Sequence, residues 1–355
     1  MKGLIASLIF LPIVAAQGQI ELKQVSMGKW SVPPANYSGI THLGEDDYAL
    51  VSDKETTDGY YPFRIVISRV DGTVLEVRRG ALLGNKNPKL DANGMSTRDT
   101  EGIVYHPSSK TYFISGEGDQ QILEYGADGA LTGRKLNIPT EFSLANITPN
   151  YGFEALAYNE KTGLFWTTTE STLPSDGPCT SATNALGQNV LRLQSFGENL
   201  EGAAQYAYRM EGASTTKFGK TYCYGVPTIT ALPDGSLLVM EREANITQNY
   251  IGSVVTNRIF RVYPQQGKTI TAATKLTALS NDVILPKMEV ARFSTRFSLT
   301  NQTFANYEGM CLGPKLDDGR QTLLLINDSQ AGYGNELIHL RDYVKVFILP
   351  QGFIK

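Results

Sequence analysis

One hairpin pattern recurs along the chain, and this repetition constrains the fold more than any other feature. Each copy has an apolar strand, a turn rich in Gly, Pro, Asp or Asn, and a second apolar strand that ends in Asp or Glu. The copies begin at Tyr37, Asp99, Tyr151, Tyr224 and Asn306. Glu101 and Glu117 of the second copy are 16 residues apart, and Glu154 and Glu170 of the third copy are also 16 residues apart. This shared interval predicts a structural unit that repeats along the chain.

Further strand-like runs follow each hairpin. Third strands are predicted at RIVISRV from Arg64, QILEYG from Gln121, VLRLQSF from Val190, RIFRVY from Arg258 and ELIHLR from Glu336, with weaker fourth strands such as TVLEVRR from Thr73 and TKLTAL from Thr274. Four short antiparallel strands per unit, without a convincing amphipathic helix, indicate an all-β fold that forms a single β-propeller. Five blades are favoured by the count, and a sixth is an alternative if residues 265–300 contain a degenerate blade rather than an insertion. The segment IELKQVSMGKW predicts an N-terminal strand that completes the last blade and closes the ring.

The first residues have the pattern of a secretory signal peptide. Lys2 precedes an apolar run from Leu4 to Val14, and the small residues Ala15 and Ala16 follow. A membrane-spanning helix needs about 20 apolar residues, so this run is too short for an anchor. We therefore expect a signal peptide at residues 1–16 and the propeller domain at residues 17–355. The mature chain is expected to be exported, periplasmic or secreted, monomeric, and not inserted in a membrane.

Charge and cysteine content exclude some partners and leave one question open. The formal net charge is -3, and no run of five or more Lys or Arg residues occurs, which disfavours nucleic acid as a partner. In an oxidising compartment Cys179 and Cys223 could form a disulfide and leave Cys311 free, or all three cysteines could be unlinked. No Cys-x-x-Cys pair is present, so a zinc site is not indicated.

The acids of the repeats are predicted to gather at one mouth of the central channel, where the loops before the first strands and after the second strands share a face. The expected set is Asp53, Glu101, Glu117, Asp119, Glu154, Glu170, Glu241, Glu243, Glu308 and Asp328. Two like charges about 4 Å apart repel by roughly 4 kcal/mol at an effective dielectric constant near 20. Positive charge, protonation or wider spacing must therefore compensate for this repulsion.

Calcium is the leading candidate for that positive charge, because Ca²⁺ takes six to eight oxygen ligands and needs neither His nor Cys. The stretch DANGMSTRDTEG from Asp91 is a candidate calcium loop, and the alternative is a polar insertion with an Asx-turn at Asn93. Histidine chemistry is not expected at this mouth: the strand register places His106 and His42 at the opposite end, and His339 is predicted to lie in a third strand.

Several motifs resemble a known family. RDTEGIVYHP, NYGFEALAYN, VMERE and NYEGMCLG are similar to segments of the phytase-like propeller domain, also described as the esterase-like domain of phytase, in the same order over about residues 35–350. The resemblance implies an exported propeller with phosphoesterase or phosphodiesterase activity. The first repeat has Ser38 where the second has Glu101, and the fourth has Pro227 near that place, so a ring with an acid from every blade is not expected.

Together these features suggest a calcium-assisted phosphoesterase or phosphodiesterase that binds a small-molecule phosphate ester. The expected catalytic residues are Glu101, Glu154 and Glu308, the expected metal ligands are Glu117, Glu170, Glu241 and Asp328, and the expected substrate-binding residues are Arg98, Arg242 and Arg296. Two alternatives remain open. One is a non-catalytic propeller that binds a metal, a glycan or a protein. The other is a sugar-lactone hydrolase, since a calcium-centred acidic mouth can also polarise a lactone carbonyl.

Overall fold

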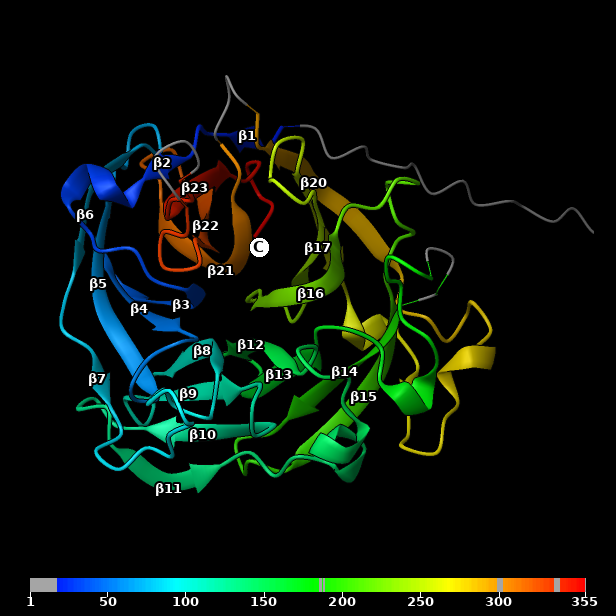
Figure 1. Cartoon of the computed structure of the whole chain (residues 1–355). Coiled ribbons are helices and arrows are strands. Elements are labelled where there is room, and N and C mark those ends of the chain that lie inside the picture. The colour runs from blue at the N-terminus through cyan, green and yellow to red at the C-terminus, as the bar shows by residue number, and fades with distance from the viewer. Residues whose placement is uncertain (1–17, 185–186, 188, 299–302, 335–338, 355) are drawn as a thin grey trace, which may run out of the picture.

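The computed structural model describes residues 18–184, 187, 189–298, 303–334 and 339–354. Five antiparallel sheets stand around one axis, with β3, β8, β12, β16 and β21 nearest the centre (Figure 1). The expected single propeller is therefore confirmed, and it has five blades. The predicted signal peptide, residues 1–16, lies outside the described residues. Among the described residues, no helix is long and apolar enough to cross a membrane.

The first two blades follow the hairpin repeats closely. Blade 1 contains β3 (Tyr37–Gly44), β4 (Asp47–Ser52), β5 (Gly59–Ile67) and β6 (Val74–Arg79), with β7 (Leu83–Gly84) paired to β5. Blade 2 contains β8 (Thr100–His106), β9 (Thr111–Gly116), β10 (Gln121–Tyr125) and β11 (Leu131–Lys135). In both, the turn residues between the first two strands interrupt the apolar pattern and let the chain reverse.

The other three blades have longer connections. Blade 3 contains β12 (Phe153–Asn159), β13 (Leu164–Thr169), β14 (Val190–Phe196), β15 (Gly202–Arg209) and β19 (Thr269–Ile270). Blade 4 contains β16 (Thr221–Ala231), β17 (Leu237–Ile246), β18 (Val254–Val262) and β20 (Lys287–Arg296). Blade 5 contains β21 (Asn306–Lys315), β22 (Gln321–Asp328) and β23 (Tyr343–Ile348). Short 3₁₀ helices lie at Met27–Trp30, Thr140–Phe142, Leu144–Asn146, Pro174–Asp176, Pro264–Gln266 and Leu276–Ala278.

Two of the predicted strands were placed wrongly. The third strand of blade 5 is β23, not the run from Glu336, half of which falls on residues outside the described part. Residues 265–300 contain neither a sixth blade nor a simple insertion. They supply β19 to blade 3 and the fourth strand, β20, to blade 4. The run from Thr274 forms a 3₁₀ turn instead of a strand.

The N-terminal segment closes the ring as predicted, although it does so with two short strands rather than one. β1 (Ile20–Glu21) and β2 (Val25–Ser26) both pair with β23, so that Ile20 faces Ile348 and Val25 faces Val344. The outer edge of blade 5 is thus covered by the start of the chain, which removes part of the exposed edge that β23 would otherwise present.

The hydrophobic core lies between the blades. Phe113 of blade 2 packs on Phe165 of blade 3 with ring centroids 4.7 Å apart, and Phe293 of blade 4 packs on Tyr307 of blade 5 at 5.4 Å. Trp166 is almost fully buried between blades 3 and 4, in agreement with a packing role. Burial of one such side chain contributes roughly 1.5 to 3 kcal/mol, so these seams hold the blades in fixed positions around the channel.

A carboxylate-rich candidate site at one mouth of the channel

The first strand of every blade has a bulge at the same end. The pairing register shifts between Tyr37 and Ile40, Thr100 and Ile103, Phe153 and Ala155, Gly225 and Thr228, and Tyr307 and Gly309. The bulged segments carry Ser38, Glu101, Glu154, Val226 and Glu308. A bulge inserts an extra residue and re-aims its side chain. It therefore explains how three blades direct a glutamate to the same mouth.

The glycine that follows some of these residues allows neighbouring first strands to approach closely. A Cβ on Gly102 would lie 2.5 Å from the carbonyl oxygen of Glu154 in the next blade. A Cβ on Gly39 would lie 2.4 Å from the carbonyl oxygen of Glu101, and one on Gly309 would lie 2.8 Å from that of Ser38. Real side chains essentially never make such short contacts. In a Glu-Gly pair the glutamate therefore faces the channel, and the glycine lets the neighbouring first strand approach closely.

A second set of acids follows the second strands. The backbone N–H of Glu117 donates to the carbonyl of Asp99 at 2.8 Å, that of Glu170 donates to Gly152 at 2.8 Å, and that of Asp53 donates to Asn36 at 3.1 Å. In blade 5, Asp328 lies opposite Asn306 at the same level. These main-chain bonds extend each hairpin by one residue and hold the carboxylates above the bulge glutamates.

Asp53, Asp99 and Glu101 bring carboxylate oxygens within 4.8 Å of one another. The group spans the seam between blades 1 and 2. Oxygens on opposite sides of Ca²⁺, each at 2.3 to 2.6 Å, would be separated by about 4.6 to 5.2 Å. The spacing therefore suits a calcium-sized cation with little rearrangement.

Two mouth carboxylates are buried without a donor. Glu101 and Glu154 are 8% and 9% exposed, and neither accepts a hydrogen bond or forms a direct ion pair within the described part of the chain. The Oδ1 atom of Asp53 is likewise buried with no hydrogen-bond partner there. Buried carboxylates in native proteins are normally paired or bound to metal, so these oxygens are available as ligands for a cation.

The electrostatics of the mouth support that inference. Burial, and then the charges of Asp53 and Glu308, raises the pKa of Glu101 well above its ordinary value. Burial, and then the charge of Glu170, does the same to the pKa of Glu154. Burial raises the pKa of Glu117 to about 7, although the Gly152 N–H, which donates to its Oε1 at 2.8 Å, acts in the opposite direction. A bound cation would relieve this repulsion and favour the ionised forms.

Arg242 supplies buried positive charge from the one blade whose bulge lacks a polar side chain. Its guanidinium donates to Glu170 of blade 3 and to Glu308 of blade 5. Burial raises the pKa of Glu308 to about 7, and Arg242 opposes this rise. Arg242 therefore lies at the mouth, with its guanidinium engaged by acids of the two neighbouring blades.

Glu241 and Glu243 lie away from this cluster, although they flank Arg242. Glu241 is fully buried, accepts from Tyr208 and Tyr224 at 2.6 and 2.7 Å, and pairs with Lys287 at 2.7 Å. Glu243 accepts from Ser214 and Tyr222. Successive residues of a strand point to opposite faces, so Arg242 reaches the channel while both glutamates face the seam with blade 3.

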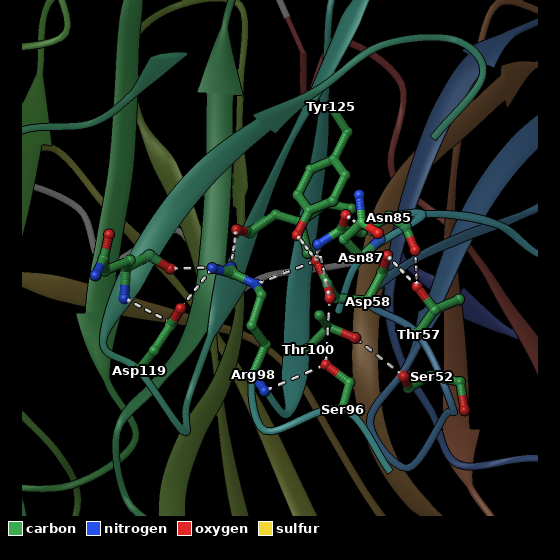
Figure 2. A network of polar contacts seen from close by, with 12 residues as sticks. Ser52, Thr57, Asp58, Asn85, Asn87, Ser96, Arg98, Thr100, Asp119 and Tyr125 are labelled. Atoms are coloured by element: carbon green, nitrogen blue, oxygen red, sulfur yellow. Dashed lines mark hydrogen bonds and ion pairs between the residues drawn. The ribbon is translucent and has the colours of Figure 1, made fainter. Parts of the chain in front are cut away.

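Arg98 also points away from the carboxylate group. It pairs with Asp119 at 2.7 Å and donates to the carbonyl of Ile114 at 3.0 Å, while its Nε lies 4.0 Å from Asp58. Figure 2 shows Arg98 between Asp119 on one side and Asp58, which accepts from Tyr125, on the other. Arg98 thus joins blades 1 and 2 directly beside Asp99, and Asp119 is paired within this network.

The remaining expected residues are also distant from the cluster. Arg296 is exposed at the end of β20, the outermost strand of blade 4. Asp91 accepts from the backbone N–H groups of Asn93 and Met95 at 2.8 and 2.9 Å, as in the Asx-turn alternative. Asp99 and Glu101 are the residues of the candidate calcium loop that belong to the carboxylate group.

Two of the three histidines lie at the opposite end of their strands from this mouth. His106 is at the turn end of β8, where its Nε2 lies 3.1 Å from Glu198. His42 lies near the turn end of β3, also away from the mouth. His339 forms an isolated bridge with Gly334 and is not part of a third strand, which corrects the prediction.

The cysteines are unlinked in the structure. Cys179, Cys223 and Cys311 all carry free thiols, so the second of the two alternatives holds. Cys223 lies beside the cluster, with its Sγ 3.6 Å from the hydroxyl of Tyr151. Burial raises the pKa of the Cys223 thiol, and the charge of Glu170 adds to this rise, so the thiol is disfavoured as a nucleophile.

Residues 33–330 match the family described as phytase-like, with esterase-like activity of phytase. The chain belongs to this family. No curated protein matches the phytase-like chain at the level of sequence.

Among solved structures, the phytase-like chain is similar to other proteins at low sequence identity. An endo-arabinase from Bacteroides thetaiotaomicron is 11% identical, with 92% of this chain and 97% of that chain covered and a TM-score of 0.43. An α-L-arabinanase from Penicillium chrysogenum is 13% identical, with 94% and 99% covered and a TM-score of 0.43. A periplasmic gluconolactonase from Pseudomonas aeruginosa is 12% identical, with 88% of each chain covered and a TM-score of 0.36.

Sequence reasoning missed one charged residue of the phytase-like site. Lys54 lies at the carboxylate group, with its Nζ 2.6 Å from Asp99 and 3.2 Å from Asp53. Its position directly after Asp53 was the available signal, because the residue after a mouth acid remains near the mouth. The sequence indicates Asp99 only as part of the candidate loop from Asp91, and its backbone φ of 53° lies in the left-handed region that Asp tolerates.

Proposed function

We propose that this phytase-like propeller is an exported, calcium-assisted phosphoesterase or phosphodiesterase that acts at the carboxylate mouth. The observation that carries the proposal is the group formed by Asp53, Asp99 and Glu101, whose oxygens lie within 4.8 Å of one another and include the buried Oδ1 of Asp53, which has no donor in the described part of the chain. Such a group offers the carboxylate oxygens that a divalent cation takes as ligands.

In this proposal Asp53, Asp99 and Glu101 hold the cation at the seam of blades 1 and 2. The cation would supply a Lewis acid for a phosphoryl oxygen and would lower the pKa of a bound water. The three ligands come from two blades, and the packed seam keeps them in place before substrate arrives. This preorganisation limits the cost of binding.

Glu154 is the proposed general base and acid. Its carboxylate has no hydrogen-bond donor in the described part of the chain, and burial raises its pKa above that of an ordinary glutamate, which favours a role in proton transfer. It would accept a proton from the attacking water as the new P–O bond forms. It would return that proton to the leaving oxygen when the ester P–O bond breaks.

Glu308 and Arg242 have a supporting role in this scheme. The guanidinium of Arg242 is held by Glu170 and Glu308, so it compensates the charge of the ring rather than presenting free donors to a substrate. Glu117 and Asp328 add negative charge near the group and strengthen its attraction for a cation.

The test is hydrolysis of p-nitrophenyl phosphate, bis-p-nitrophenyl phosphate, phytate and sugar lactones by the purified protein, with calcium or with EGTA. Calcium-dependent release from a phosphate ester, lost in Glu101→Gln and Glu154→Gln but kept in the exposed outer-strand variant Glu289→Gln, supports the proposal. Hydrolysis of lactones alone would replace it with a lactonase. Calcium binding without turnover of any of these substrates would favour a non-catalytic binding propeller.

A further inference from the structure

Lys54 contacts the same carboxylates that the proposed cation would use. Its Nζ lies 2.6 Å from Oδ1 of Asp99 and 3.2 Å from Oδ2 of Asp53. Within the described residues, these two carboxylates are its ion-pair partners. The ammonium thus contacts one ligand from each of the two blades that form the group.

One ammonium group does not satisfy these acids. Oδ1 of Asp53 stays buried without a hydrogen-bond partner, and Glu101 has no direct ion pair within the described chain. A lysine donates up to three hydrogen bonds and carries a single charge, whereas Ca²⁺ carries two charges and accepts oxygens from all sides. The lysine therefore compensates the group only in part and leaves a need that a divalent cation meets.

We propose that Lys54 takes the place of the cation in the metal-free protein and, once a cation displaces it, binds the anionic group of the substrate. The inference rests on the proposed function, because it requires a cation at Asp53, Asp99 and Glu101. It assigns to Lys54 a role as a substrate-binding residue.

The placement of Lys54 allows this exchange. Its side chain is 54% exposed and lies in the connection between β4 and β5, so no packing must be broken when the ammonium moves. Lysine has a flexible four-carbon stem, and its ammonium binds phosphate as a point charge. An ammonium released from Asp99 would stay at the mouth, within one side-chain length of the cation.

The first test is calcium affinity measured by isothermal titration with calcium chloride at fixed ionic strength. Lys54→Met removes the competing charge, so we expect calcium affinity to rise about fivefold, the order of an exposed ion pair. Lys54→Arg keeps the charge and should bind calcium as the wild type does. Lys268→Met removes a comparable exposed lysine, paired with Asp282 at 2.5 Å on the outside of the molecule, and should also leave the affinity unchanged.

The second test is the binding of phenylphosphonate, a non-hydrolysable anion, to the calcium-loaded protein. We expect Lys54→Met to weaken it about tenfold, as for loss of a charged hydrogen bond, and Lys54→Arg to restore most of the affinity. Unchanged or weaker calcium binding by Lys54→Met, or unchanged phenylphosphonate binding, would overturn the role of Lys54 and leave the calcium site standing. No calcium binding by the wild type would overturn the site and the role of Lys54 together.

Discussion

Arg242 on the second strand of blade 4 donates to the carboxylate of Glu308 on the first strand of blade 5. The same guanidinium donates to Glu170 of blade 3, so one side chain joins three blades at the mouth. All three groups are largely buried, and the loss of one partner of a buried ion pair leaves uncompensated charge behind.

Replacement of Arg242 by Leu should therefore be strongly destabilising. We expect the free energy of unfolding to fall by about 3 kcal/mol or more, since Glu170 and Glu308 would remain without their cation. Urea denaturation followed by tryptophan fluorescence measures this change. Arg292→Leu is the matched control, because Arg292 pairs with Glu289 on an exposed strand. Equal losses in the two variants would contradict the role given to Arg242.

The metal-free protein should be more stable in mild acid than at neutral pH. Glu117 and Glu308 have an ordinary pKa of 4.5 and a folded-state pKa of about 7. The folded state therefore binds more protons than the unfolded state between these values, and the free energy of unfolding falls as pH rises through this window. One unit of pKa shift corresponds to about 1.4 kcal/mol, so we expect a loss of a few kcal/mol between pH 5 and pH 8.

This pH dependence can be measured by urea denaturation in EGTA at constant ionic strength. The double variant Glu117→Gln/Glu308→Gln lacks the two titrating groups and should show a flatter profile. A wild-type stability that rises from pH 5 to pH 8 would be the opposite sign and would show that these carboxyls are not held in their protonated form.

Calcium should raise the melting temperature through the group at blades 1 and 2. A ligand at 100 times its dissociation constant stabilises the folded state by about 2.7 kcal/mol, which corresponds to several degrees. We expect the shift to disappear in Asp53→Asn and Glu101→Gln. Glu241→Gln should lower the starting melting temperature, because Glu241 is buried with Lys287, yet it should retain the calcium shift. A shift that persists in Glu101→Gln would place the cation elsewhere.

Gly102 should not tolerate a side chain. A Cβ there would lie 2.5 Å from the carbonyl oxygen of Glu154 and would push blade 3 away from blade 2. We expect Gly102→Ala to lower the free energy of unfolding by about 1 to 3 kcal/mol, as overpacking does in cores. Gly212→Ala, where nothing lies within 4 Å of the added Cβ, is the control and should change stability little. Similar effects of the two substitutions would show that the seam relaxes around the added methyl group.

The propeller and much of its mouth could be predicted from the repeats, because the 16-residue interval places the acids of successive hairpins at one level. The register of the repeats correctly placed Glu101, Glu154 and Glu308 near one another. It could not distinguish the two faces of β17, where Glu241 and Arg242 are adjacent in sequence but point in opposite directions. Strand alternation separates the two faces, and the partners of each side chain show which face meets the channel: Glu241 accepts from Tyr208, whereas Arg242 donates to Glu170.

Other expectations failed because the partners are distant in sequence or the strand was not recognised. Arg98 is drawn towards Asp119 and Asp58 of two blades, and neither contact follows from its neighbours in the chain. Arg296 lies in β20, an outer strand whose exposed alternate residues weaken its apolar signal, so the sequence predicts an insertion or a degenerate blade there. Lys54 comes directly after the expected acid Asp53, but a single lysine in a loop has no sequence pattern that predicts where its side chain lies.

The pairing of Ile20 with Ile348 has a consequence for the way the chain reaches its final state. Ile20 and Ile348 are 328 residues apart in the chain, and contacts of such long sequence separation form slowly. β23 therefore presents an open edge until the N-terminal segment docks on it. During this interval the edge of β23 is the natural place for another chain to add a strand, so aggregation during production should depend strongly on residues 20–26.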